Sequence, residues 1–173
     1  MDSSGYSSPD IHRRIGPAAS AMRRLHRVCS NRRLRLSSNF RVYNACVLHV
    51  LLYDSETCTL LKEDGKKLQT FHMRCQGQLL EVRWIDFVTN VTVSECTSLS
   101  DIRDIVAGRR HSLFGDISRF PAHVSANMVL KQSVDVRSGT KSSSDWTRLQ
   151  DRPRNTWVKQ LVAESGMAAV ELW

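Results

Sequence analysis

The sequence predicts a mainly α-helical protein, built as a small helical bundle followed by short helices and a basic linker. Apolar residues recur every three to four positions through much of the chain, which is the spacing of one buried helix face. The alternation of apolar and polar residues that is typical of strands is scarce. With 173 residues, 41% of them hydrophobic, the chain is long enough for one domain with a core or for two small ones.

A polar segment and an amphipathic helix begin the chain. Residues 1–10 lack the apolar core of a signal peptide, and we expect them to form a disordered tail. The pattern that follows predicts a helix over residues 18–29. At about 100° per residue, Arg23, Arg24 and Arg27 gather on one side of this helix. The opposite side, which we expect to pack, consists of Ala18, Ala21, Met22, Leu25, Val28 and Cys29.

An apolar run over residues 40–53 predicts a buried helix of the core. It is only 14 residues long and contains polar side chains, so it is too short and too polar to span a bilayer. Ser37 or Ser38 can cap its start by accepting a hydrogen bond from a free backbone N–H. Asp54 and Ser55 mark its expected end.

A third amphipathic helix is expected around residues 66–82. Its basic side carries Lys66, Lys67 and Arg74. Its apolar side consists of Leu68, Phe71, Cys75, Leu79 and Val82.

Shorter elements follow this bundle. A turn at residues 84–90 precedes a short helix at 91–96, and Ser98 or Ser100 is expected to cap a longer helix that stops at Pro121. Gly108 and Gly115 lie inside that longer helix and each costs about 1 kcal/mol relative to Ala, which leaves open whether it is one helix or two.

The last part of the chain is a basic linker and a helix. Residues 133–154 are rich in Ser, Thr and basic residues and show no periodicity. A helix is expected to open at Asn155 or Thr156 and to bury Trp157, Leu161 and Val162. The expected domains are a tail over 1–10, a bundle over 11–82, a helical region over 83–135, a basic linker over 136–155 and a truncated C-terminal helix over 156–173.

Positive charge is concentrated near the start of the chain. Residues 11–53 contain nine arginines and no lysine, aspartate or glutamate, while the whole chain has a net charge of +8. A field of one sign repels itself unless an anion lies against it, and a planar guanidinium matches phosphate with two hydrogen bonds. Nucleic acid is therefore the first partner to consider, although a run of charge is often only a solvated surface.

Motifs for metal or nucleophilic chemistry are missing. The five cysteines lie 12 to 21 residues apart without a CxxC pair, which argues against a disulfide framework and a zinc finger. His72 and Cys75 have metal-ligand spacing, but without a second pair they are expected to be packed in the core. We expect no catalytic residue, no metal and no cofactor, and a location in the nucleus or cytoplasm, where thiols stay reduced.

A series of short motifs resembles the thumb and post-thumb region of non-LTR (LINE-type) retrotransposon reverse transcriptases, that is, of RNA-directed DNA polymerases encoded by transposable elements. The matching motifs occur in the family's order over nearly the whole chain. They are Asp10-Ile11-x-Arg13-Arg14-Ile15-Gly16, Leu25, Arg41-Val42-Tyr43-Asn44-Ala45-Cys46-Val47, Leu51-Leu52-Tyr53-x-Ser55-Glu56-Thr57, Phe71-His72-Met73-Arg74-Cys75, Ile85-x-Phe87-Val88-Thr89-Asn90, Arg109-Arg110-x-x-Leu113-Phe114-Gly115 and Arg152-Pro153-Arg154-x-Thr156-Trp157.

The resemblance implies a thumb-like bundle that grips template and primer behind the polymerase palm. Its partners would be the backbone of RNA or DNA, with no membrane, and the palm and fingers of the parent polymerase. The palm motif Tyr-x-Asp-Asp, whose carboxylates hold the catalytic metals, does not occur. The resemblance therefore implies a non-catalytic fragment. The expected nucleic-acid contacts are Arg13, Arg14, Arg23, Arg24, Arg27, Arg32, Arg33, Arg152 and Arg154.

The chain also departs from the family pattern. Cys29 and Cys58 stand where the family tends to have Trp, and Gly77 stands where a basic residue is usual. Asp116 replaces a usual His, and Asp151 replaces the Gly before the Arg-Pro-Arg motif. These changes are typical of a decaying copy. The alternative hypothesis is a small basic nucleic-acid-binding or scaffold protein that the host uses without any role in reverse transcription.

Overall fold

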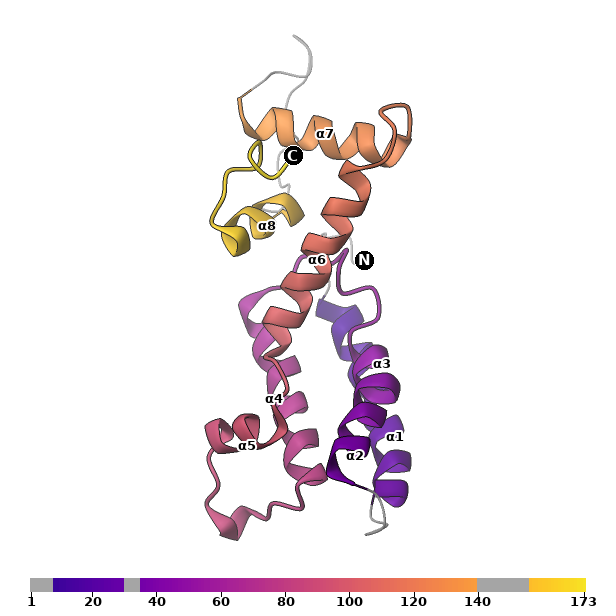
Figure 1. Ribbon diagram of the computed structural model, residues 1–173, viewed down its shortest axis with the longest axis vertical. Coiled ribbons are helices and arrows are strands. Elements are labelled where there is room, and N and C mark those ends of the chain that lie inside the picture. Colours follow the sequence, from indigo (N-terminus) through magenta and orange to yellow (C-terminus); the bar gives the residue numbers. More distant parts are fainter. Residues whose placement is uncertain (1–7, 30–34, 140–155) are drawn as a thin grey trace. The chain divides into compact units, whose positions relative to one another are not determined.

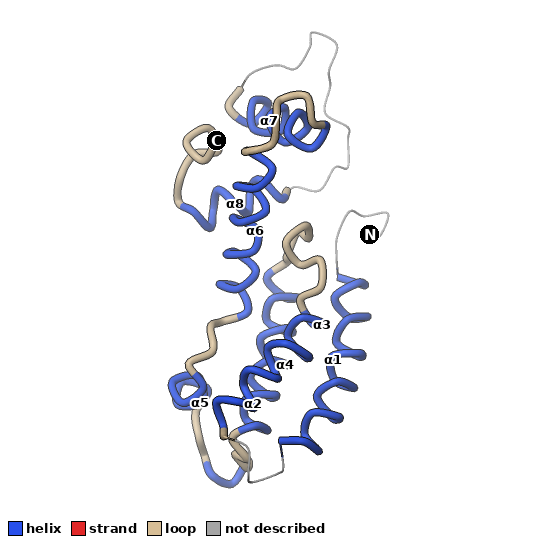
Figure 2. Tube along the Cα trace, turned by 45° about the vertical axis from the view of Figure 1, so that its right-hand side comes forward, coloured by secondary structure: helices blue, strands red, loops and turns tan. Residues whose placement is uncertain are grey.

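The computed structural model describes residues 8–29, 35–139 and 156–173, and this part of the chain is helical, without a strand (Figures 1 and 2). The mainly helical class is thus confirmed. The elements are α1 (Ser8–Cys29), α2 (Leu36–Tyr43), the π-helix η1 (Asn44–Leu48), α3 (His49–Leu51), α4 (Lys62–Leu79), the 3₁₀ helix η2 (Trp84–Asp86), α5 (Asn90–Thr97), α6 (Ile102–Ser118), α7 (Ser125–Arg137) and α8 (Trp157–Ser165).

The described residues divide into two compact units. The first unit contains residues 8–29, 35–54 and 60–105. The second contains residues 55–59, 106–139 and 156–173. The division falls inside α6, so one continuous helix contributes to both units.

Helix α1 begins at Ser8, ten residues before the predicted start. The prediction of a disordered tail up to residue 10 was therefore wrong for residues 8–10. Pro9 lies in the first turn, where a missing N–H removes no helical hydrogen bond. The negative charge of Asp10 is stabilised by the positive end of the helix dipole. Asp10 also pairs with Arg14 one turn later, at 3.0 Å.

The predicted core helix extends through α2, η1 and α3. Tyr43, Val47 and Leu51 are its buried contacts. Neither of the proposed serine caps is used: the N-cap residue is Arg35, whose carbonyl accepts the backbone N–H of Ser38 at 2.9 Å. Helix α3 ends at Leu51, the Leu52 N–H still donates to the Leu48 carbonyl at 2.9 Å, and the chain then turns.

Helices α4 and α5 complete the first unit beside α1 to α3. Leu68, Cys75 and Leu79 on α4 are buried as predicted, whereas Phe71 and Val82 are only half-buried. The short helix predicted at residues 91–96 is α5, and its N-cap is the Thr89 hydroxyl, which accepts the N–H of Thr92 at 3.3 Å.

Helix α6 is continuous, so its two glycines do not divide it. At its start, the Asp101 carboxylate accepts the N–H of Arg103 at 2.8 Å, so Asp101 makes the capping contact expected of Ser98 or Ser100.

The second unit has its own apolar core. The predicted basic linker begins later than residue 133 or 136, because α7 remains helical to Arg137. Helix α8 starts as predicted, with the Thr156 hydroxyl accepting the N–H of Lys159. The rest of the linker, residues 140–155, lies outside the described residues. The buried core consists of Phe114, Leu130, Val134, Val158, Leu161 and Ala169.

Candidate nucleic-acid interface

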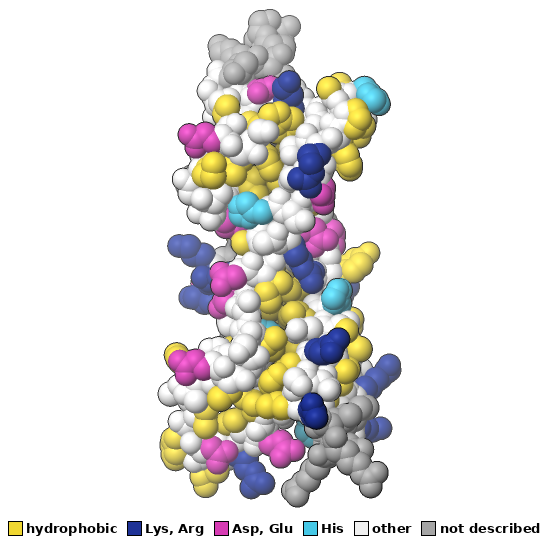
Figure 3. All heavy atoms as spheres, viewed as in Figure 1, with side chains coloured by type: hydrophobic (Ala, Val, Ile, Leu, Met, Phe, Trp, Pro, Cys, Tyr) yellow, Lys and Arg dark blue, Asp and Glu magenta, His cyan; other side chains and the backbone are white. Residues whose placement is uncertain are grey.

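Four of the five arginines of α1 lie on the side of the helix that faces away from the core of the first unit. Arg13, Arg23, Arg24 and Arg27 are exposed, and we call these four the arginine face. In Figure 3, basic side chains stand out along the right-hand edge of the lower half, where Figure 1 draws α1. The opposite side of the helix is buried and consists of Ile11, Ala18, Met22 and Leu25. This is the arrangement that the periodicity predicts.

A shallow hollow lies on this surface between Ser20, Arg23, Arg24 and Arg27. Within the described part of the chain, these three guanidinium groups have no carboxylate partner. Arg23 and Arg27 are one turn apart, about 6 Å along the axis. The hollow therefore offers a hydroxyl and several unpaired cations to one anionic group.

Arg14 does not belong to this surface. Arg14 is only 9% exposed. Its guanidinium pairs with Asp10 and donates a hydrogen bond to the Tyr53 carbonyl. Position 14 is three residues after Ile11 and four before Ala18, so it lies on the packed side of the helix. We therefore remove Arg14 from the expected phosphate contacts and assign it to holding α1 against the turn after α3.

Four further predicted contacts cannot be placed. Arg32, Arg33, Arg152 and Arg154 lie outside the described residues and stay predictions.

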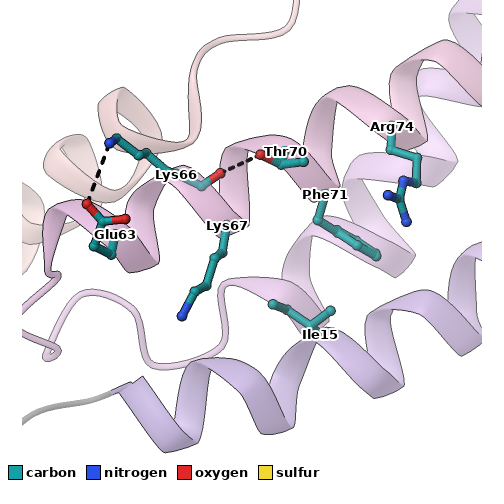
Figure 4. A pocket seen from close by; sticks show the side chains of 7 residues that line it. All are labelled: Ile15, Glu63, Lys66, Lys67, Thr70, Phe71 and Arg74. Carbon is teal, nitrogen blue, oxygen red and sulfur yellow. Dashed lines mark hydrogen bonds and ion pairs between the residues drawn. The ribbon is translucent and has the colours of Figure 1, made fainter.

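A second basic surface, formed by the predicted basic side of the third helix, lies between α1 and α4 (Figure 4). It is a groove, and we call it the α1–α4 groove. The repetition of basic residues at 67 and 74 around the aromatic residue at 71 was the sequence signal that could have revealed it. Its lining residues are Ile15, Glu63, Lys66, Lys67, Thr70, Phe71 and Arg74.

The cations of this groove differ in their partners. Lys66 pairs with Glu63 at 3.5 Å, and both side chains are well exposed. Lys67 lies 3.5 Å from the buried Asp64 carboxylate and 3.2 Å from the imidazole Nε2 of His12. Arg74 is exposed and, among the described residues, has no ion-pair partner. Arg74 is therefore the cation most available to an incoming anion.

The two residues with metal-ligand spacing belong to the interior of the first unit. His72 and Cys75 are both buried, as the packed-core interpretation predicts, and the Tyr43 hydroxyl lies 2.7 Å from His72 Nδ1. Burial lowers the pKa of His72, and burial raises the pKa of Cys75 to about 12. The thiol is thus protonated and unreactive at neutral pH. Among the described residues, no group of three His, Cys, Asp or Glu side chains is placed to hold a metal ion.

Arg110, part of one of the matching motifs, is also structural. Its side chain is fully buried, pairs with Glu164 and donates to the Cys58 carbonyl at 3.1 Å. A guanidinium enclosed in this way cannot reach a phosphate on the surface.

The chain matches no family model, no curated protein and no solved structure. None of the helices in the described ranges has the length and apolar content needed to cross a membrane. Fold and surface together define a mainly helical protein with basic helical surfaces.

Proposed function

We propose that this chain binds the phosphate backbone of RNA or DNA through the arginine face of α1, as a non-catalytic part of the C-terminal region of a non-LTR retrotransposon reverse transcriptase. The observation that carries the binding proposal is the contrast along α1. Arg14 on the packed side is paired within the protein, whereas Arg23, Arg24 and Arg27 surround one hollow without a described acidic partner.

Such a cluster is suited to phosphate for physical reasons. Like charges within one or two helical turns repel each other, and an anion placed between them relieves that repulsion. Each guanidinium can form two parallel hydrogen bonds with phosphate oxygens. Contacts of this kind hold any sequence, which suits a protein that must grip a template along its whole length.

The acidic residues do not support polymerase chemistry. The sequence lacks the Tyr-x-Asp-Asp motif, and the buried Asp64 is engaged by the Ser8 hydroxyl and by Lys67. Reaction with nucleotides would have to come from other parts of a parent polymerase. The second candidate function, a basic nucleic-acid-binding or scaffold protein of the host, rests on the same surface without reverse transcription.

The salt dependence of duplex binding tests the proposal. The variant Arg23→Gln/Arg24→Gln/Arg27→Gln should flatten the slope of log K against log[salt] by roughly two to three units, because each neutralised phosphate releases about 0.9 counterion. Gln is a good helix former, so circular dichroism should be unchanged. The relative affinity for different duplex sequences should also stay the same.

A control variant removes the same charge from dispersed exposed positions. Lys62→Gln/Lys131→Gln/Lys159→Gln lowers the net charge equally without touching the arginine face. We expect it to change the slope much less. An equal change in both variants would show that only net charge matters, and no change in the folded arginine variant would mean that the arginines face water or a protein partner.

A further inference from the structure

The α1–α4 groove combines an apolar wall with two flanking cations. Phe71 of α4 and Ile15 of α1 face each other across it (Figure 4). Lys67 precedes Phe71 by four residues and Arg74 follows it by three, so the three side chains share one side of α4. Along the helix axis, Lys67 lies about 6 Å to one side of Phe71 and Arg74 about 4.5 Å to the other.

This spacing matches the chemistry of a nucleotide in a single strand. A base has an apolar face that stacks on an aromatic ring, and the strand places a phosphate on either side of that base. Phe71 is only half-buried, so its ring is accessible from the groove. In a duplex the base faces are covered by stacking, and an aromatic ring in the wall of a groove does not reach them.

The partners of the cations indicate which phosphate contact is strongest. Lys67 is already shared between Asp64 and His12, whereas Arg74 carries no ion pair within the described ranges. Glu63 sits at the far end of the groove and is neutralised by Lys66.

We propose that the α1–α4 groove binds one unpaired nucleotide of a single strand, with its base between Phe71 and Ile15 and its phosphate on Arg74. This inference rests on the proposed function, because both take nucleic acid as the ligand. It adds a site for a single strand to the duplex-binding surface of the arginine face.

The test compares three probes on the full chain by fluorescence anisotropy: a short oligothymidylate, an abasic strand of the same length, and a duplex. Phe71→Leu keeps an apolar, helix-compatible side chain and removes the ring. It should weaken oligothymidylate binding about five-fold or more, since stacking contributes on the order of 1–3 kcal/mol per base. Binding of the abasic strand and of the duplex should change less than about two-fold. Phe120→Leu, a partly exposed aromatic residue in the second unit, should alter none of the three.

Arg74→Gln provides a second readout that does not disturb the half-buried ring. It should reduce the salt slope on the single strand by about 0.7 unit, the value for one phosphate contact. Lys131→Gln, which removes an exposed charge elsewhere, should leave this slope unchanged.

The possible results separate the two proposals. If Phe71→Leu weakens the normal and abasic strands equally, or weakens neither while staying folded, no base stacks in the groove and the inference is overturned. If Phe71→Leu unfolds the chain, an unchanged slope in Arg74→Gln overturns it. Competition by polyglutamate that matches oligothymidylate of equal charge would show a site for acidic protein segments and also overturn it. If Arg23→Gln/Arg24→Gln/Arg27→Gln kept the wild-type salt slope on duplex, that result would refute only the proposed function of the arginine face.

Discussion

Single arginine residues differ in role more than their number suggests. Arg27 is exposed on α1, Arg14 is paired on the packed side of the same helix, and Arg110 is fully buried. The net charge of the chain counts these three arginines equally and does not show which of them is exposed. Periodicity separates Arg27 from Arg14, because position 14 falls among buried positions of α1, and this signal was present in the sequence. The burial of Arg110 depends on Glu164 and Cys58, which are more than 50 positions away, and no local pattern predicts that.

His72 should make the stability of the first unit depend on pH. Neutral His72 accepts the Tyr43 hydroxyl at Nδ1 and donates from Nε2 to the Ser100 carbonyl. Burial lowers its pKa in the folded state below the ordinary value of about 6.5. As the pH falls below about 6.5, the unfolded chain takes up a proton that the folded chain excludes, so the free energy of unfolding falls by up to about 1.4 kcal/mol per pH unit.

Denaturant unfolding between about pH 5 and 8 measures this effect. His72→Gln should flatten the dependence, and His123→Gln, at an exposed histidine, should keep it. Parallel pH profiles for the wild type and His72→Gln would contradict the assignment. Above about pH 7 both states are neutral at His72, and no slope from this residue is expected.

At the scale of elements, the positions of helices were more predictable than their ends. The start of α8 was predictable as Asn155 or Thr156 because such side chains cap helices, and the Thr156 hydroxyl accepts the N–H of Lys159. The starts at Arg35 and Leu61 use no side-chain cap, and only α4 carries another local mark, the acidic Glu63 and Asp64 in its first turn. The π-helix η1 was not predictable from the sequence either. It is only five residues long, so its wider turn leaves the apolar spacing of the core helix nearly intact.

Two glycines of the second unit should respond in opposite directions to alanine. Gly108 lies inside α6 in ordinary helical backbone, and an added Cβ would meet nothing within 4 Å. Gly108→Ala should therefore stabilise the unit by about 1 kcal/mol. Gly166 ends α8 in the left-handed region with φ of 69°, and its N–H donates to the Val162 carbonyl. Gly166→Ala should destabilise the unit by about 1–2 kcal/mol.

Chemical denaturation of both variants checks these values, and each variant serves as the control for the other. A destabilising Gly108→Ala would show that α6 needs the glycine for a reason other than backbone conformation. A neutral Gly166→Ala would mean that the end of α8 rearranges without cost.

At the scale of the whole molecule, the division into two units was not predictable from local patterns. The expected boundaries followed changes of composition, whereas the division follows contacts between distant segments. Residues 55–59 belong to the second unit, where the Cys58 carbonyl accepts from Arg110 and the Glu56 carbonyl accepts from Trp157 Nε1. These contacts join residues 52 and 101 positions apart. Periodicity identifies which side of a helix is buried but not which distant partner buries it.

The Arg110–Glu164 pair offers a test of how far the two units act separately. Glu164→Ala leaves the fully buried guanidinium with only the Cys58 carbonyl as a described partner, and breaking a buried pair in this way costs about 3–5 kcal/mol. Arg110→Met should cost less, because Met fills similar volume without a charge and the Glu164 side chain, 29% exposed, can turn towards water.

Hydrogen exchange localises the effect, since it reports opening segment by segment. Because both partners of Arg110 belong to the second unit, amides of α7 and α8 should exchange faster in Glu164→Ala than in Arg110→Met, while those of α1 and α4 keep their wild-type rates. Equal acceleration in the two variants would mean that the buried charge is not what makes the pair necessary. Faster exchange in α1 and α4 would mean that the units unfold together, and a basic surface built on α1 would then depend on a salt bridge at the other end of the sequence.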